Sequence, residues 1–166
     1  KDSALIRLKN NISEALIGFS DDQLSVELKD GKLYVSLSEK LLFKTGSTKV
    51  DPKGEDALNK VAQVLKAQDN IDIVVEGHTD DVPIGNSCIK DNWDLSVKRA
   101  TAVVRVLEEE HYVAPERMIA AGRSQFLPIA ENSSSGGRSL NRRTEIVITP
   151  RLDQFFELLE APELAN

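Results

Sequence analysis

Three short segments carry polar side chains whose types and spacing could do chemistry. Residues 77–81, Gly-His-Thr-Asp-Asp, directly follow a run rich in β-branched residues. Asn92 and Arg99 lie two helical turns apart, so in a helix they share one face. Arg142 and Arg143 directly precede another apolar alternating run. Together these segments offer carboxylate, amide and guanidinium groups, which are the groups that proteins use to bind charged or polar ligands.

Each segment also has a purely structural interpretation. Asp and Thr commonly stabilise turns, and this is the simpler interpretation of Asp80 when its loop is taken alone. Asn92 could cap the start of a helix, and Arg99 could be an ordinary solvated side chain. A surface charge run is the simpler interpretation of Arg138, which lies in a Ser- and Gly-rich stretch. No segment alone therefore decides between binding and structure.

Metal or catalytic chemistry forms a competing hypothesis. His78, Asp80 and Asp81 could serve a metal-dependent hydrolase, although their spacing matches no zinc pattern. The sequence contains neither a phosphate-binding loop nor a nucleophile elbow, and Cys88 has no evident His partner. We therefore expect a binding domain with no catalytic residue, no metal and no cofactor.

The elements that must position these residues follow from hydrophobic periodicity. Helical spacing predicts four helices, over residues 3–18, 52–65, 92–110 and 153–160. Alternation or a β-branched run predicts five strands, over residues 24–28, 33–37, 71–76, 118–121 and 144–149. The first two strands form a hairpin around Asp30 and Gly31, and residues 124–141 are predicted to be a loop. This order predicts an α+β fold, with a mixed sheet packed against helices.

Composition excludes several classes of protein. The chain has 166 residues, of which 40% are hydrophobic and 29% charged, so it can bury a core and is not disordered throughout. Its formal charge of −6 argues against a broad nucleic-acid surface. One Cys allows no internal disulfide, and no run approaches the ~20 apolar residues of a membrane span. Because the chain opens on Lys1, we expect it to be a piece of a longer protein.

Taken in order and spacing, the motifs resemble the OmpA-like peptidoglycan-binding domain family. The resemblance rests on Gly77-His78-Thr79-Asp80, Asn92-x-x-Leu95-Ser96-x-x-Arg99-Ala100 and Asn141-Arg142-Arg143. Residues 43–58 are similar to the family's opening segment, and the long loop 81–91 with Asn92-Trp93-x-Leu95-Ser96 resembles the MotB-type branch. The family resemblance implies a βαβαββ core over residues 41–150 with helices on one face. Residues 1–40 would then be an N-terminal helix and hairpin extension on the linker side, and 151–166 a C-terminal helix and tail.

The resemblance also implies a function. Members of the family hold peptidoglycan without catalysis, through the diaminopimelate of the stem peptide. Asp80 matches the aspartate that binds the ammonium group, and Arg99 matches the arginine that binds the carboxylate. Four further residues are implied to line the pocket, and two to add positive charge at its rim: Thr79, Asn92, Leu95 and Ser96, then Arg143 and, less directly, Arg142.

The resemblance extends to partners and location. It implies a periplasmic domain that anchors a longer protein, which a segment outside this chain would tether to the inner or outer membrane. A homodimer formed through residues 1–40 is one arrangement that the resemblance allows. Nucleic acid is not expected as a partner. A protein-interaction module, in which Arg143 and its neighbours bind acidic partners, is the remaining alternative.

Overall fold

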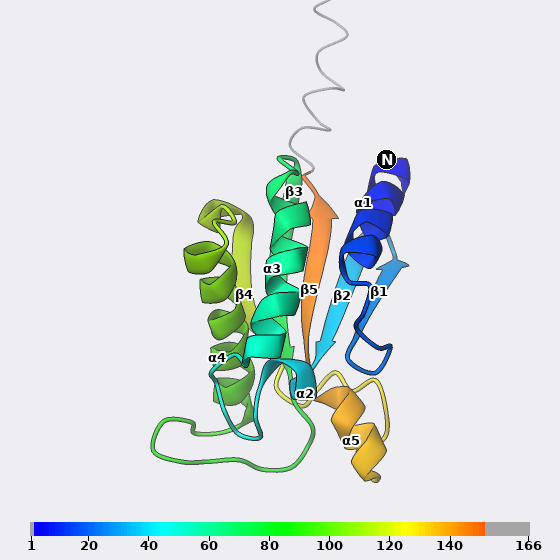
Figure 1. Ribbon diagram of the computed structural model, residues 1–166. Coiled ribbons are helices and arrows are strands. Elements are labelled where there is room, and N and C mark those ends of the chain that lie inside the picture. Colours follow the sequence, from blue (N-terminus) through cyan, green and yellow to red (C-terminus); the bar gives the residue numbers. More distant parts are fainter. Residues whose placement is uncertain (1, 152–166) are drawn as a thin grey trace, which may run out of the picture.

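The computed structural model describes residues 2–151, which form a five-stranded mixed sheet in the order β1-β2-β5-β3-β4 (Figure 1). The strands are β1 (Leu24–Lys29), β2 (Lys32–Ser38), β3 (Ile71–His78), β4 (Met118–Gly122) and β5 (Arg143–Pro150). Only β3 and β4 are parallel, and every other pair is antiparallel. The predicted α+β fold with a mixed sheet is confirmed.

The long helices cover one face of this sheet, as predicted. They are α1 (Asp2–Ala15), α3 (Pro52–Lys66) and α4 (Asn92–Arg105), and all three lie on the same side in Figure 1. Two short helices, α2 (Glu39–Leu42) and α5 (Ser135–Asn141), lie at one end of the sheet. The remaining helical turns are η1 (Val106–Glu110), a π-helix that follows α4, and η2 (Pro115–Arg117), a 3-10 helix. Within residues 2–151, none of the helices has the length and apolarity that a membrane crossing needs.

The core lies between the helices and the inner face of the sheet. Alternate residues of β2 (Leu33, Val35 and Leu37) are fully buried, while those between them are partly exposed. The tight β1–β2 turn follows from Asp30 and Gly31, which both take positive φ angles, 52° and 74°, as a two-residue hairpin turn requires. In β2, period-two alternation therefore identified both the strand and the face that it buries.

The N-terminal hairpin belongs to the same sheet as the rest of the chain. Strand β2 pairs with β5 from Leu33 opposite Ile148 to Ser38 opposite Arg143. The first strand of the core is thus β2, upstream of residue 41, and residues 41–150 contribute β3, β4 and β5. The boundary predicted at residue 40 falls inside a continuous sheet, and its division of the chain into domains stays a prediction.

The loop predicted over residues 124–141 is wrong in its second half, where α5 forms. Ser134 caps this helix by accepting a hydrogen bond from the backbone of Gly137, at 2.9 Å. The buried side chain of Asn141 then accepts hydrogen bonds from the backbones of Ile129 and Ala130, which fixes the preceding turn. Helix propensity alone missed this element, because its Ser and Gly residues favour turns in isolation. The predicted helix at 153–160 lies outside the described residues.

A charged hollow beyond strand β3 is the candidate functional site

The site depends on an unusually close approach between helix α4 and the sheet. A Cβ atom at Gly77 on β3 would overlap the backbone carbonyl of Ser96 on α4. At Gly122 on β4, a Cβ would overlap side-chain atoms of Ser96 and Val97. Only glycine permits this contact, which brings the start of α4 beside the loop that leaves β3. The Gly of the Gly-His-Thr-Asp motif therefore has a packing role.

A hollow of about 330 Å³ opens where β3 ends and α4 begins. Of the eight residues predicted for the site, six line this hollow: Thr79, Asp80, Asn92, Leu95, Arg99 and Arg142. The other two, Ser96 and Arg143, do not line it. The hollow is also lined by residues that were not predicted: Glu39, Thr45, Gly46, Val82, Pro83, Ile84 and Arg138.

Asp80 is the acidic centre of the hollow and is only 7% exposed. Its Oδ1 accepts a hydrogen bond from the backbone N–H of Val82 at 3.0 Å, which fixes the carboxylate in the turn after β3. Its Oδ2 accepts a 2.7 Å charge-assisted hydrogen bond from Nη1 of Arg142. Asp80 is therefore a fixed carboxylate that already holds one cation.

Arg99 is the buried cation of the hollow, at 4% exposure. Its Nε donates to the backbone carbonyl of Ser47 at 3.0 Å, and its guanidinium carbon lies 4.9 Å from the centre of the Phe43 ring. Its Nη1 donates to Glu39 at 2.5 Å. Among residues 2–151 its Nη2 is buried with no hydrogen-bond partner. Since buried donors are nearly always paired, this nitrogen is suited to an acceptor supplied by a ligand.

Glu39 and Arg142 join Asp80 and Arg99 into one ionic network. Oε1 of Glu39 accepts from Nε of Arg142 at 3.0 Å, and Arg142 reaches Asp80 with its Nη1. We call Glu39, Asp80, Arg99 and Arg142 the site quartet. Burial alone would lower the pKa of Arg142, but its hydrogen bond to Asp80 and the charge of Glu39 raise it overall. The quartet therefore holds two negative and two positive charges.

The other predicted residues support the hollow in different ways. The amide nitrogen of Asn92 donates to the backbone carbonyls of Asp80 and Val82, at 3.3 and 3.1 Å, and to Gln125 at 3.3 Å. The hydroxyl of Thr79 donates to the carbonyl of Asp80 at 2.8 Å. Leu95 contributes an apolar wall from the same face of α4 as Arg99. Asn92 therefore fastens the start of α4 to the loop rather than capping the helix, which Asp91 does.

Two residues expected at the hollow lie elsewhere. Ser96 is fully buried beneath α4, where its hydroxyl donates to the carbonyl of Trp93 and accepts from the backbone of Ser124. Arg143, expected at the rim, packs on the opposite face of the sheet with Glu145. Neighbouring residues of an extended chain point to opposite sides, so only one of Arg142 and Arg143 can face the hollow, and it is Arg142.

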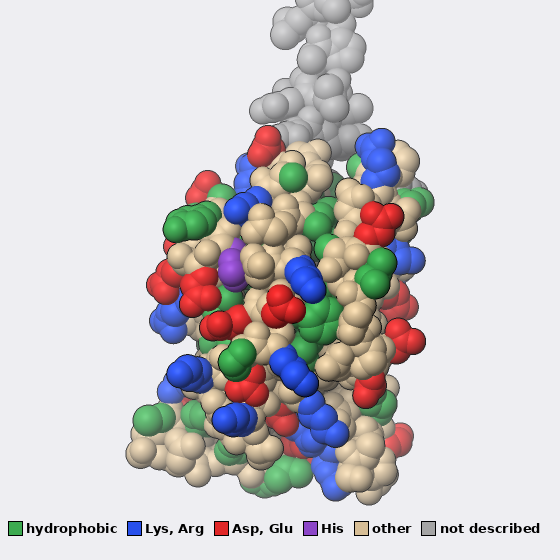
Figure 2. Space-filling view, viewed as in Figure 1, with side chains coloured by type: hydrophobic (Ala, Val, Ile, Leu, Met, Phe, Trp, Pro, Cys, Tyr) green, Lys and Arg blue, Asp and Glu red, His purple; other side chains and the backbone are tan. Residues whose placement is uncertain are grey.

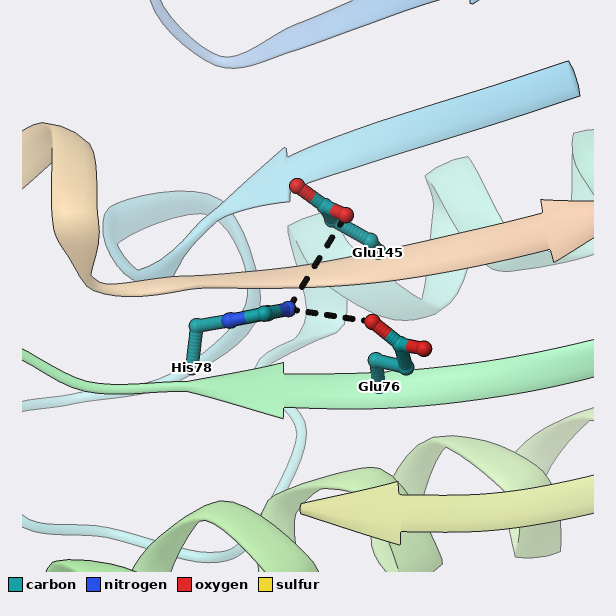
Figure 3. Close-up of side chains that lie close together, drawn as sticks. All are labelled: Glu76, His78 and Glu145. Carbon is teal, nitrogen blue, oxygen red and sulfur yellow. Dashed lines mark hydrogen bonds and ion pairs between the residues drawn. The ribbon is translucent and has the colours of Figure 1, made fainter. Parts of the chain in front are cut away.

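The metal hypothesis built on His78, Asp80 and Asp81 is not supported by the geometry. His78 lines a different hollow, on the open face of the sheet, where its Nε2 lies 3.3 Å from Glu76 and 3.9 Å from Glu145 (Figure 3). We call Glu76, His78, Arg143 and Glu145 the sheet cluster. Donor atoms of Glu76, His78 and Glu145 lie within 4.8 Å of one another, a spacing that could hold a metal ion.

The surroundings of the sheet cluster fit an ionic network better than a metal centre. Arg143 binds Glu145 at 2.8 Å and Arg123 lies 3.6 Å from Glu76, so each carboxylate already has a cation. In the described part of the chain, the buried Nδ1 of His78 also lacks the hydrogen bond that orients most metal-binding histidines. Because each carboxylate already has a cation, the +2 charge of a bound divalent ion would have no anion to compensate it. His78 would also lack the hydrogen bond that orients it as a ligand.

Two of the lining residues that were missed from the sequence, Glu39 and Arg138, are charged. Ser38 and Glu39 carry only the signal of a helix start, a capping hydroxyl followed by an acidic residue. Arg138 comes to the hollow because α5 forms, and its Nη1 donates to the carbonyl of Asn132. Figure 2 shows basic side chains gathered at the end of the molecule where α2 and α5 lie, with acidic side chains between them.

Comparison with known proteins places this chain in a family. The sequence matches the OmpA family over residues 42–142, which is more than half of the chain. The chain belongs to the OmpA family. The predicted resemblance is therefore confirmed, and the match includes Asp80, Arg99 and Arg142 but begins after Glu39.

Individual relatives of this OmpA-family chain are MotB-like. Motility protein B of Bacillus subtilis is 30% identical over 131 residues, 79% of this chain and 50% of that protein, so the chain spans about half of this relative. The crystal structure of a putative MotB-like protein from Desulfovibrio vulgaris has the same fold, with a TM-score of 0.80, 23% identity and coverage of 90% and 94% of the two chains. The cell wall anchor of the T6SS from Pseudomonas aeruginosa superposes with a TM-score of 0.76 at 30% identity, covering 87% and 98%.

Proposed function

We propose that this OmpA-family domain binds peptidoglycan without catalysis, through the diaminopimelate of the stem peptide. Asp80 holds the ammonium group of the ligand, and Arg99 holds the carboxylate on the same carbon. Thr79, Asn92 and Leu95 shape the pocket, and Arg142 adds positive charge beside it. The bound domain anchors a longer, membrane-tethered protein to the cell wall in the periplasm.

The observation that carries this proposal is the buried, unpartnered Nη2 of Arg99, a residue that lines the same hollow as Asp80. An amino acid end group is a zwitterion, so its recognition needs one fixed anion and one fixed cation close together. Charge-assisted hydrogen bonds of this kind each contribute roughly 1.5–3 kcal/mol net. The hollow is modest in volume, which suits an end group better than a whole glycan strand.

Two further observations support anchoring. One of the similar solved structures is described as a cell wall anchor, and a relative is a motility protein. In Figure 1 the start of α1 lies at the end of the molecule opposite α5 and the loop after β3. A tether that reaches α1 would therefore leave the hollow facing away from it. Weak binding at each site is compensated because one wall polymer offers many sites.

Co-sedimentation with purified cell walls tests the proposal. Asp80→Asn and Arg99→Gln should move the protein from the pellet to the supernatant. The matched controls are Asp81→Asn and Arg105→Gln, because both change the same charge at exposed neighbours, in the same loop and the same helix. Retention of the Asp80 and Arg99 variants in the pellet would show that the assigned pocket is wrong. Sedimentation equilibrium tests the separate expectation of a homodimer.

A further inference from the structure

Glu39 is a carboxylate inside the ligand site that lies outside the residues matched to the family. It is the first residue of α2 and is only 7% exposed. Its two oxygens accept from Arg99 at 2.5 Å and from Arg142 at 3.0 Å, and its backbone N–H donates to the carbonyl of Arg142. A buried carboxylate is costly unless it is paired, so the two arginines account for its burial.

Glu39 pairs with the guanidinium that would bind a ligand carboxylate, and Arg142 pairs with the carboxylate that would bind a ligand ammonium. Glu39 sits on the guanidinium of Arg99, while Arg142 sits on Asp80. Each group that would grip the ligand thus already has an internal counter-ion. The quartet is neutral, and Arg138 lines the same hollow with its Nη1 on a backbone carbonyl.

We infer that Glu39 determines specificity, by making the site reject carboxylates that do not carry an ammonium group beside them. This inference rests on the proposed function. A ligand carboxylate that reaches Nη2 of Arg99 lies next to the carboxylate of Glu39. Two neighbouring negative charges repel each other strongly in a partly buried site. An ammonium group on the same carbon compensates, because it binds Asp80 and leaves Arg142 to neutralise Glu39.

A purely structural role for Glu39 makes a different prediction. If Glu39 only orients Arg99, its replacement should weaken every ligand that uses Arg99, and by a similar factor. If Glu39 selects by charge, its replacement should help a ligand without ammonium groups and leave a zwitterion unchanged or weaker. The ratio of two affinities therefore separates the two roles, and neither affinity alone does so.

The experiment measures binding of diaminopimelate and of pimelate by isothermal titration calorimetry. Pimelate has the same seven-carbon chain and both carboxylates but no amino groups. For the unaltered chain we expect diaminopimelate to bind more tightly. In Glu39→Gln, which keeps the size of the side chain, the preference for diaminopimelate should fall by about tenfold, as removal of one full charge beside a guanidinium implies. An unchanged ratio would overturn the inference.

Arg142→Gln provides the reciprocal variant and protects the test against misfolding of the first. It removes a positive charge and frees Asp80, so the preference for diaminopimelate over pimelate should rise. A fall in this ratio would also overturn the inference. If the unaltered chain binds diaminopimelate but Glu39→Gln leaves the ratio unchanged, only the inference fails. If the unaltered chain binds neither ligand, the proposed function fails as well, and the inference falls with it.

Discussion

The site quartet and the sheet cluster use the same kinds of side chain to different ends. Each places two glutamate or aspartate carboxylates beside arginine, and both depend on β3 or the loop that follows it. The quartet draws its members from α2, the loop after β3, α4 and the residue before β5. The sheet cluster draws its members from β3 and β5 alone.

This difference in origin decides what each group can do. Glu76 and Glu145 lie directly opposite each other across two antiparallel strands, and His78 lies opposite Arg143. Strand register holds them in place, and each carboxylate has a cation, Arg143 for Glu145 and Arg123, just after β4, for Glu76. Both groups line a hollow, and each contains a buried nitrogen with no partner in the described chain, Nδ1 of His78 and Nη2 of Arg99, but only in the quartet does that nitrogen belong to a guanidinium cation. Similar side chains are therefore fixed by strand register in the sheet cluster, whereas in the quartet they are brought together from helix ends and a loop, and one guanidinium nitrogen still lacks an acceptor.

The largest effect is expected at Gly77, which lies between Glu76 and His78 on β3 and packs against α4. Gly77→Ala would force the backbone of α4 away from the sheet, because a Cβ there overlaps Ser96. Overpacking of this kind should lower the free energy of unfolding by about 3 kcal/mol and abolish ligand binding. Urea unfolding and calorimetry measure the two effects.

Gly136→Ala is the control for this substitution. It lies in α5 with no atom within 4 Å of the added Cβ, so its stability should stay equal or rise slightly. Wild-type stability and binding in Gly77→Ala would mean that α4 does not depend on this close approach.

The two arginines Arg99 and Arg143 should separate binding from stability. Arg99→Gln should weaken diaminopimelate binding by about 10- to 150-fold, the equivalent of one lost charge-assisted hydrogen bond. Arg143→Gln should leave binding within about twofold but lower the free energy of unfolding by about 2 kcal/mol, because Glu145 loses its 2.8 Å partner. Calorimetry measures ligand binding and urea titration measures stability in both variants. Loss of binding in Arg143→Gln would contradict the comparison.

The sheet cluster should also make stability depend on pH. The pKa of Glu76 is below its ordinary value of 4.5, first because of the hydrogen bond with His78; burial opposes this, and the charge of Arg123 adds to it. Because the folded state has the lower pKa, the stabilisation is complete above the unfolded value of about 4.5. This stabilisation is lost as the pH falls from about 4.5 through the lower pKa that Glu76 has in the folded state.

Glu76→Gln tests this dependence. At neutral pH it should cost about 1 kcal/mol, and its stability should fall less steeply than that of the unaltered chain as pH drops below about 4.5. Urea unfolding at a series of pH values measures both slopes. Parallel slopes would show that Glu76 does not supply the dependence. Ligand binding at neutral pH should not change, since Glu76 does not line the site hollow.

The sequence predicted the parts of the site that depend on local periodicity. The β-branched run of β3 and the two-turn spacing of Asn92 and Arg99 place a carboxylate and a guanidinium at the same end of the sheet, and both line the hollow. Local periodicity marked these residues as candidates, because a strand end and a helix face are properties of one short segment, but it was the family resemblance that assigned them to a ligand site. Their roles toward a ligand stay a prediction.

The parts that the sequence did not predict depend on contacts between distant segments. Glu39 meets Arg99 only because α2 follows β2, whose pairing with β5 no local pattern reveals. The choice between Arg142 and Arg143 depends on where α5 ends, and the prediction had a loop there. Period-two alternation shows that neighbours point to opposite sides, but it does not say which side holds the ligand.

The smallest effect is expected at Lys98, which helps to fasten the long loop over the hollow. Its Nζ donates to the carbonyl of Cys88, and Asp94 accepts from the backbone of Lys90 at 2.8 Å, so α4 holds the loop at two points. Val82, Pro83 and Ile84 of that loop line the hollow.

Lys98→Ala should therefore weaken diaminopimelate binding by only about twofold, because the ligand must then order a looser loop. Lys66→Ala, exposed on α3, is the control and should not change affinity. NMR order parameters of residues 82–90 should fall in Lys98→Ala alone. A tenfold loss would mean that the loop belongs to the binding surface as fully as the quartet does.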